Sequence, residues 1–342
     1  MGGREWVDSR CIVLCSLRVV RRVGVGVRVA SGDPVSTRHA KAISFVMAHL
    51  FFVIDQFRAL SGSVEPPTIV QMAEIGPIWT QEALRDSPHI DAEKARKVQG
   101  MFAAIAGSYD LNNRLHSFFQ DQRWRRAAVR AAGVDATTRV LDVACGTGDL
   151  AEAFADAGAA EVTGVDFTPE MLAIARDKGL KNQSAPRADA ASTSPGSTTV
   201  RPAVAYHQGD AMQLAFPDQS FDVVSIAFGI RNVAVPARAL AEFFRVLRPG
   251  GRLVVLEFAD PTNPIVRWGS NLYTKRIMPW TASMVARDAS GAYHYLPRSV
   301  STFLQPREFA EKLQENGFEQ CSAAPLTMGI CVLHRAIRPK NR

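Results

Sequence analysis

The chain lacks the cysteine pattern of a disulfide-stabilised or zinc-binding protein. Its 342 residues contain five cysteines, an odd number, and no two of them form a C-x-x-C pair. Scattered cysteines of this kind argue against a disulfide framework and against a structural metal site. We therefore expect a protein of the reducing cytoplasm that binds no metal.

The chain also lacks an apolar run that could cross a bilayer. Its segment ISFVMAHLFFVIDQF, residues 43–57, is interrupted by His49 and Asp55 and falls short of the ~18 uninterrupted apolar residues of a transmembrane helix. A signal peptide would place its apolar stretch nearer the start, before a small-residue cleavage site. We interpret residues 1–90 as a poorly ordered N-terminal extension, and a membrane anchor is the alternative.

Acidic residues are scarce at the N-terminus. Residues 1–41 carry eight basic and three acidic side chains, a surplus of five within a net charge of +7. Most of the basic excess therefore lies outside the part of the chain that carries the motifs described below. We expect no nucleic-acid partner.

From about residue 91 the pattern is that of alternating helices and strands. Two helical segments, separated by the turn-rich stretch SYDLNN, precede strand-like runs such as RVLDV, FDVVSIAFG and GRLVVLEFAD with helices between them. This alternation predicts an α/β fold with a mostly parallel sheet and crossover helices. The C-terminal runs EQCSAAPLT and GICVLHRAI predict a closing antiparallel hairpin.

Two segments interrupt the alternation. Residues 183–203 are rich in Ala, Ser, Thr and Pro, which is typical of a flexible surface insertion. Residues 261–300 form a longer excursion that is rich in aromatic residues and poor in strand signals. We expect residues 91–342 to form one domain that carries both segments.

A glycine-rich turn, DVACGTGDLA at 142–151, follows the first predicted strand. Ligands of open parallel sheets bind beyond the carboxyl ends of the strands, where this turn lies. Gly146 and Gly148 allow the backbone to approach a ligand closely. Together with Ala151 they also match the dinucleotide fingerprint G-x-G-x-x-A, and Asp166 follows about 20 residues later. A dehydrogenase is therefore one hypothesis.

Acidic residues near the turn argue against a dinucleotide. Asp142, Asp149 and Asp210 would lie close to its pyrophosphate, and two like charges ~4 Å apart cost about 4 kcal/mol at an effective dielectric near 20. S-adenosylmethionine has no phosphate and carries a sulfonium and an ammonium group. We predict that it binds here, with Asp166 at the ribose hydroxyls and Asp210 with Ala211 at the adenine edge.

Several blocks of the sequence then resemble one family. They are FAAIAGSYDLNNRLHSFFQDQRWRR, VLDVACGTGDLA, GDAMQLAFPDQSFDVVSIAFGIRNV, RVLRPGGRLVVLEF and LTMGICVLHRA. In this order, over about residues 93–338, they resemble the ubiquinone/menaquinone biosynthesis C-methyltransferase family. The resemblance implies a class I methyltransferase (Rossmann-like) fold, with a seven-stranded sheet and helices on both faces. It also implies S-adenosylmethionine as donor and a ring carbon of a polyprenylated benzoquinol or naphthoquinol as acceptor.

The resemblance also assigns the donor site. It implies donor contacts from Thr147, Asp166, Asp210 and Ala211, and the turn itself adds Asp142, Gly146 and Gly148 to the candidates. Many members have serine where Ala227 stands in this sequence, so a side-chain contact with the donor is absent at that position.

Methylation of a ring carbon requires an activated phenol. The hydroxyl has a pKa near 10, so the protein must favour its ionised form or remove its proton. Arg231, just past the fourth strand in the stretch FGIRNV, is our candidate because a guanidinium is always charged. We expect it to face the donor methyl, with Asn232 orienting a ring oxygen.

Tyr109, Asp110 and Asn113 are further candidates, because the segment before the sheet folds over the acceptor pocket in this architecture; turn formation and core packing are the alternative for them. In the 261–300 excursion, Arg287, Asp288, Tyr293 and Tyr295 are candidates for the entrance of a polyprenyl tail, or for the core of that segment.

A polyprenyl quinol dissolves in the bilayer. We therefore expect a cytoplasmic protein in peripheral contact with the inner face of the membrane. A methyltransferase for a small soluble acceptor and a donor-binding module without turnover are the alternatives. The sequence leaves open the choice between benzoquinol and naphthoquinol, the general base and the oligomeric state.

Overall fold

The computed structural model describes residues 78–80, 82, 84–85, 87–184, 201–274, 278 and 291–340. The chain divides into two compact units, Met1–Met72 and Ala73–Arg342, and every described residue belongs to the second unit. Most of the predicted N-terminal extension and of the 183–203 insertion therefore lies outside the described residues, as do Arg287 and Asp288.

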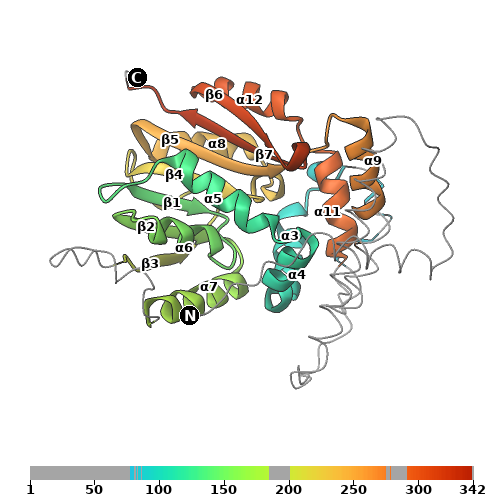
Figure 1. The fold of residues 1–342 in the computed structure, drawn as a ribbon, viewed down its shortest axis with the longest axis horizontal. Coiled ribbons are helices and arrows are strands. Elements are labelled where there is room, and N and C mark those ends of the chain that lie inside the picture. Colours follow the sequence, from blue (N-terminus) through green and yellow to red (C-terminus); the bar gives the residue numbers. More distant parts are fainter. Residues whose placement is uncertain are drawn as a thin grey trace, which may run out of the picture. The chain divides into compact units, whose positions relative to one another are not determined.

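A seven-stranded sheet forms the centre of the second unit (Figure 1). Its order is β3-β2-β1-β4-β5-β7-β6. The first five strands in this order run parallel, and β7 lies antiparallel between β5 and β6. The strands are β1 (Arg139–Val143), β2 (Glu161–Asp166), β3 (Val204–Gln208), β4 (Phe221–Ala227), β5 (Leu247–Phe258), β6 (Glu319–Leu326) and β7 (Cys331–Ile337). The predicted parallel sheet and closing hairpin are confirmed.

Helices cover both faces of the sheet, as predicted. On one face, α5 (Gln120–Ala132), α6 (Asp149–Asp156) and α7 (Pro169–Ser184) pack against side chains such as Val140 and Val223. On the other, α8 (Pro236–Val246) and α12 (Pro306–Glu315) pack against the adjacent residues Leu141 and Val224. Successive residues of each strand thus enter different cores, as the two-residue period of a strand requires.

A third group of helices gathers at one end of the strands, on the right of Figure 1. It comprises η1 (Pro88–Ile90), α3 (Lys94–Ile105), η2 (Ala106–Ser108), α4 (Tyr109–His116), α9 (Pro264–Leu272) and α11 (Ala292–Ser301). Trp79, Leu84, Val98, Met101 and Tyr295 form a small separate core within this group. Packed residues therefore begin upstream of residue 91, where the sequence placed the domain boundary.

The stretch SYDLNN differs from its predicted turn. Residues 109–116 form the helix α4, in which the Asn112 amide donates to the Ser108 hydroxyl (3.1 Å) and Leu115 is buried. Short polar residues favour turns because they compete for backbone hydrogen bonds. Here the Asn112 amide nitrogen has a side-chain partner one turn away, which satisfies that donor within a helix, whereas the amide oxygen has no hydrogen-bond partner.

Candidate active site

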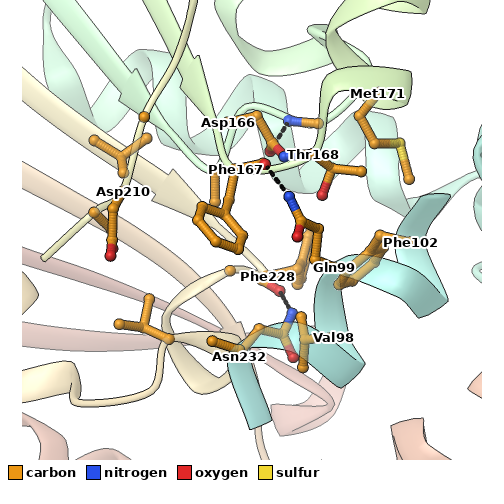
Figure 2. A pocket seen from close by; sticks show the side chains of 18 of the residues that line it. Val98, Gln99, Phe102, Asp166, Phe167, Thr168, Met171, Asp210, Phe228 and Asn232 are labelled. Atoms are coloured by element: carbon orange, nitrogen blue, oxygen red, sulfur yellow. Dashed lines mark hydrogen bonds between the residues drawn. The ribbon is translucent and has the colours of Figure 1, made fainter. Parts of the chain in front are cut away.

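A pocket opens at the carboxyl ends of β1 to β4, where the strand order reverses between β1 and β4 (Figure 2). About 820 Å³ of space, including open solvent at the mouth, lies between its lining residues. Gln99 of α3 closes one side, because its amide donates to the Phe167 carbonyl at the end of β2 (2.9 Å). The covering helix is thereby tied to the sheet.

Asp166 organises the polar side of the pocket. One carboxylate oxygen accepts from the Gly146 backbone N–H and the other from the Thr168 backbone N–H, both at 2.8 Å. Gly146 has a φ of +55°, a left-handed conformation that glycine adopts at little cost. Burial raises the pKa of the Asp166 carboxyl, although these N–H donors oppose the rise. Asp166, which we predicted to bind the ribose hydroxyls, thus lines the pocket and holds the glycine turn in place.

Asp142 lies beneath the pocket and does not line it. It is 1% exposed, one of its oxygens accepts from the Ser225 hydroxyl of β4 (2.6 Å), and the other has no hydrogen-bond partner. Burial raises the pKa of this carboxyl to about 7. Its predicted contact with the donor stays a prediction.

Two other polar groups of the turn point into a charged network. The Thr147 hydroxyl donates to Asp110 (2.5 Å), and Lys178 of α7 bridges Asp110 and Asp149 at 2.8 and 2.5 Å. Burial favours the neutral form of Asp149, but Arg125, Lys178 and Arg114 outweigh it and lower its pKa. Thr147 and Gly148 do not line the described pocket, and the Asp149 charge is neutralised within the protein.

Asp210, Ala211 and Ala227 line the pocket, and their contacts with the donor stay predictions. One Asp210 oxygen accepts from the Met212 backbone N–H (2.8 Å), which holds the carboxylate at the end of β3. Ala227 is the last residue of β4. Three of the residues predicted for the donor site therefore lie at the ends of β3 and β4, beside one pocket.

The Arg231 side chain lies behind the pocket wall. From the sequence we predicted instead that it would face the donor methyl and the acceptor. It is 4% exposed and is absent from the pocket lining. Its Nη1 lies 2.5 Å from Glu257 Oε1 of β5 and 2.8 Å from the Phe228 carbonyl. The reason is the turn after β4: Phe228 has a φ of +57°, and the chain folds Arg231 back onto β5.

Asn232, by contrast, lines the pocket (Figure 2). Its amide nitrogen donates to the Phe228 carbonyl (3.2 Å), and its amide oxygen accepts from the Tyr295 hydroxyl of α11 (2.9 Å). Both ends of the amide are thus held. Tyr295, a candidate for the tail entrance, is buried and positions Asn232.

Tyr109 also lines the pocket. Its ring lies edge-on to Phe102 of α3, with ring centroids 6.0 Å apart. Burial raises the pKa of its hydroxyl, although Arg125 and a hydrogen bond with Asn113 oppose the rise. Tyr109 therefore keeps its proton and is suited to donate a hydrogen bond.

Sequence reasoning missed Glu257 and Gln99. A signal for Glu257 was present, since a lone carboxylate in the apolar run LVVLEF of a central strand requires a buried partner. For Gln99 there was no such signal, because its role depends on how α3 crosses the end of β2.

The charge of the pocket decides between the two proposed cofactors. The described residues that line it include two carboxylates, Asp166 and Asp210, and no lysine or arginine. This set fits the cationic S-adenosylmethionine and disfavours a pyrophosphate. With the sheet order and the glycine turn after β1, it defines a class I S-adenosylmethionine-dependent methyltransferase.

Comparison with known proteins identifies the family. The model of the ubiE/COQ5 methyltransferase family matches residues 90–338, and the chain belongs to this family. It is 42% identical to the demethylmenaquinone methyltransferase of Deinococcus radiodurans over 70% of this chain and 91% of that protein. It is 43% identical to the Thermus thermophilus enzyme of the same name, over 70% and 100%. Identity to the ubiquinone/menaquinone biosynthesis C-methyltransferase UbiE of Ectopseudomonas mendocina is 36%, over 76% and 95%.

Two features are absent from the described residues. No helix among them is long and apolar enough to cross a membrane. Within the same ranges, no group of three or more His, Cys, Asp or Glu side chains is arranged to hold a metal ion.

The Arg231–Glu257 pair predicts strong coupling between its partners. Arg231→Met should lower the free energy of unfolding by about 3–5 kcal/mol, because it leaves the buried Glu257 unpaired. The double variant Arg231→Met/Glu257→Gln should recover much of this loss, since it buries no charge. Urea unfolding measures both. Arg307→Met, which breaks an exposed pair with Glu311, is the control and should cost under about 1 kcal/mol. A double variant as unstable as the single one would contradict the coupling.

Asp142 predicts a pH-dependent gain in stability for Asp142→Asn. The folded protein keeps the Asp142 proton up to about pH 7, whereas an unperturbed carboxyl releases it near 3.8. Wild-type stability should therefore fall as the pH rises through this window. The melting temperature of the variant, relative to wild type, should rise between these two pH values and then stay level. Calorimetry at both ends of the window checks this, and an unchanged difference would exclude a protonated Asp142.

Proposed function

We propose that the chain methylates a ring carbon of a polyprenylated quinol, using S-adenosylmethionine, in menaquinone or ubiquinone biosynthesis. One observation carries the proposal: a single pocket joins an acidic end, with Asp166 and Asp210, to an end walled by Val98, Phe102 and Phe228. The first end suits a cationic donor and the second suits an aromatic ring. The names of the relatives support the same acceptor class.

The reaction forms one carbon–carbon bond. The donor supplies an electrophilic methyl group. The acceptor hydroxyl first loses its proton, and the ring carbon then bonds to the methyl carbon as the sulfur–methyl bond breaks. The ring hydrogen leaves as a proton when aromaticity returns, and water reprotonates the oxygen. The protein must therefore hold the ring oxygen, favour its ionised form and exclude water from the methyl group.

Three side chains are proposed to do this. Tyr109 keeps its proton and donates to a ring oxygen. Asn232, held by Tyr295 and the Phe228 carbonyl, presents its second amide N–H to the ring. Arg231 acts through the loop, because its guanidinium holds the Phe228 carbonyl and is paired with Glu257.

A naphthoquinol is the first acceptor to test. Two relatives named demethylmenaquinone methyltransferase are 42% and 43% identical over 70% of this chain, a third of that name is 37% identical, and UbiE relatives are 36–37% identical. A benzoquinol is the alternative within the same class, and a small soluble acceptor is the alternative outside it.

Methyl transfer to demethylmenaquinol should be measurable directly. Purified protein, methyl-labelled S-adenosylmethionine and demethylmenaquinol or a demethylubiquinol analogue should yield labelled quinol. Asn232→Ala should lower kcat/KM by about 10²-fold, because the ring loses its orientation. Asn316→Ala, at the exposed end of α12, should behave as wild type. Label in neither quinol would sink the quinone assignment.

We also propose that the protein docks on the membrane surface, since the acceptor is dissolved in the bilayer. Support comes from α9, where Ile265, Trp268 and Leu272 share one face and are 55%, 65% and 43% exposed. Residues 261–287 contain four basic residues and no acidic one. An exposed apolar face with tryptophan and basic neighbours suits the interface of an anionic bilayer.

Vesicle flotation tests the α9 surface. The full chain should float with phosphatidylglycerol-containing vesicles, and Trp268→Glu should reduce the floating fraction about tenfold or more, because a charge enters the apolar interface. Leu180→Glu, at a residue of α7 that is also 65% exposed, is the matched control and should float as wild type. Equal flotation of the two variants would remove α9 as the docking surface.

A further inference from the structure

Lys94 is a buried cation at the back of the pocket wall. It lies on α3 and is 1% exposed, although the next residue, Ala95, lines the pocket. Its ammonium donates to the Val233 carbonyl (2.5 Å) and to His89 Nδ1 (3.3 Å). Val233 itself lines the pocket. Lys94 thus holds the loop after β4 from the side of the covering helix.

The hydrogen bonds of His89 show that Lys94 has a neutral partner. His89 Nε2 lies 2.9 Å from the Ser299 carbonyl, which can only accept. The proton is therefore on Nε2, and Nδ1 accepts from Lys94. Burial lowers the pKa of His89, although its hydrogen bond to Ser299 opposes this, so the imidazole stays neutral.

No carboxylate balances the Lys94 charge among the described residues. The partners of its ammonium are the Val233 carbonyl and the His89 imidazole, and both are uncharged. The other cations nearby are paired: Arg231 with Glu257, and Lys97 with Asp91. Burial and the repulsion of Arg231 lower the pKa of Lys94 to about 8, which still leaves it mainly protonated at neutral pH.

The titratable groups on the elements around Lys94 do not neutralise its charge. They are His89 on η1, Arg231 on η3 (Ile230–Asn232), Glu257 on β5, Tyr295 on α11, the Lys97–Asp91 pair beside η1, and Tyr109 and Asp166 across the pocket. The Glu257 charge is engaged by Arg231, Tyr295 is neutral, and Asp166 is held by backbone N–H groups on the donor side. Counting the described residues, the net charge behind the loop 230–234, which we call the acceptor wall, is therefore positive.

We propose that Lys94 is a positioning residue that places an unbalanced positive charge behind the loop 230–234 and so favours loss of the acceptor hydroxyl proton. The inference rests on the proposed function, because it assumes a phenolic acceptor. It assigns to Lys94 the electrostatic role that the sequence suggested for Arg231. The Arg231 charge is cancelled at contact distance, whereas the Lys94 charge is not.

Lys94→Gln tests the charge separately from the hydrogen bond, since glutamine can still donate to the Val233 carbonyl. With a truncated quinol, the acidic limb of the kcat/KM profile should move up by about one pH unit. Turnover at neutral pH should fall about tenfold. The Kd for S-adenosylmethionine should stay within about twofold. Arg96→Met, also on α3 but with a side chain that is 73% exposed and paired with Glu93, is the control and should match wild type. An unshifted profile in Lys94→Gln would overturn the proposal.

Thermal unfolding separates this role from a structural one. An unbalanced buried cation lowers stability at neutral pH, because its folded pKa lies below the value of an exposed lysine. Lys94→Gln should therefore melt no lower than wild type while it loses turnover. A lower melting temperature with proportionate loss of donor binding would show a scaffold residue and overturn the proposal.

A bound probe separates this inference from the proposed function. A nitrophenol reports its own ionisation by visible absorbance, with no methyl transfer required. Its midpoint in the pocket should be about one pH unit lower in wild type than in Lys94→Gln. Equal midpoints would overturn the role of Lys94 even if quinols are methylated. A shifted midpoint without methylation of any quinol would instead overturn the quinol assignment.

Discussion

The acceptor wall depends on the buried ion pair between Arg231 and Glu257. Through one guanidinium nitrogen it joins β5 to the Phe228 carbonyl, at a residue held with a positive φ. Removing two charges from water costs several kcal/mol per ion, which is offset only while both partners are in contact. The turn also needs Gly229, since a Cβ there would lie 2.6 Å from the Ala144 Cβ. The loop is therefore confined to one arrangement.

This arrangement lets three separate elements, β5, α11 and α3, hold the six residues 228–233. Arg231 is held by β5, Asn232 by Tyr295 of α11, and Val233 by Lys94 of α3, while the Phe228 N–H donates to the Leu256 carbonyl (2.7 Å). Each neutral hydrogen bond contributes only about 0.5–1.5 kcal/mol net. Held at successive residues, the loop has little freedom left, and a ring placed against Asn232 meets a preorganised wall.

The sheet and the donor side were predictable because they follow local rules. Strand–turn–helix order identified the parallel sheet, and the carboxyl-end rule placed Asp166, Asp210 and Ala227 around one pocket. Two predictions failed, one for a local reason and one for a non-local reason. The SYDLNN stretch forms most of the first part of α4, where the Asn112 amide nitrogen donates to a side chain one turn away. The direction of Arg231 depended on the φ of Phe228 and on a partner 26 residues away. The burial of Lys94 had no local signal, because it follows from the packing of α3 against the loop.

Negative charge lines one end of the pocket, and positive charge lies behind the other end. The proposed chemistry explains this arrangement. A sulfonium donor and a phenolate acceptor attract each other, and their charges cancel as the methyl group transfers. Each must nevertheless be stabilised before they react. Asp166 and Asp210 provide negative charge where a cationic donor would bind, and Lys94 provides positive charge behind the opposite wall. A full salt bridge to either reactant would oppose the cancellation. A charge held one layer behind the wall, as Lys94 is, favours the phenolate with less resistance to its neutralisation.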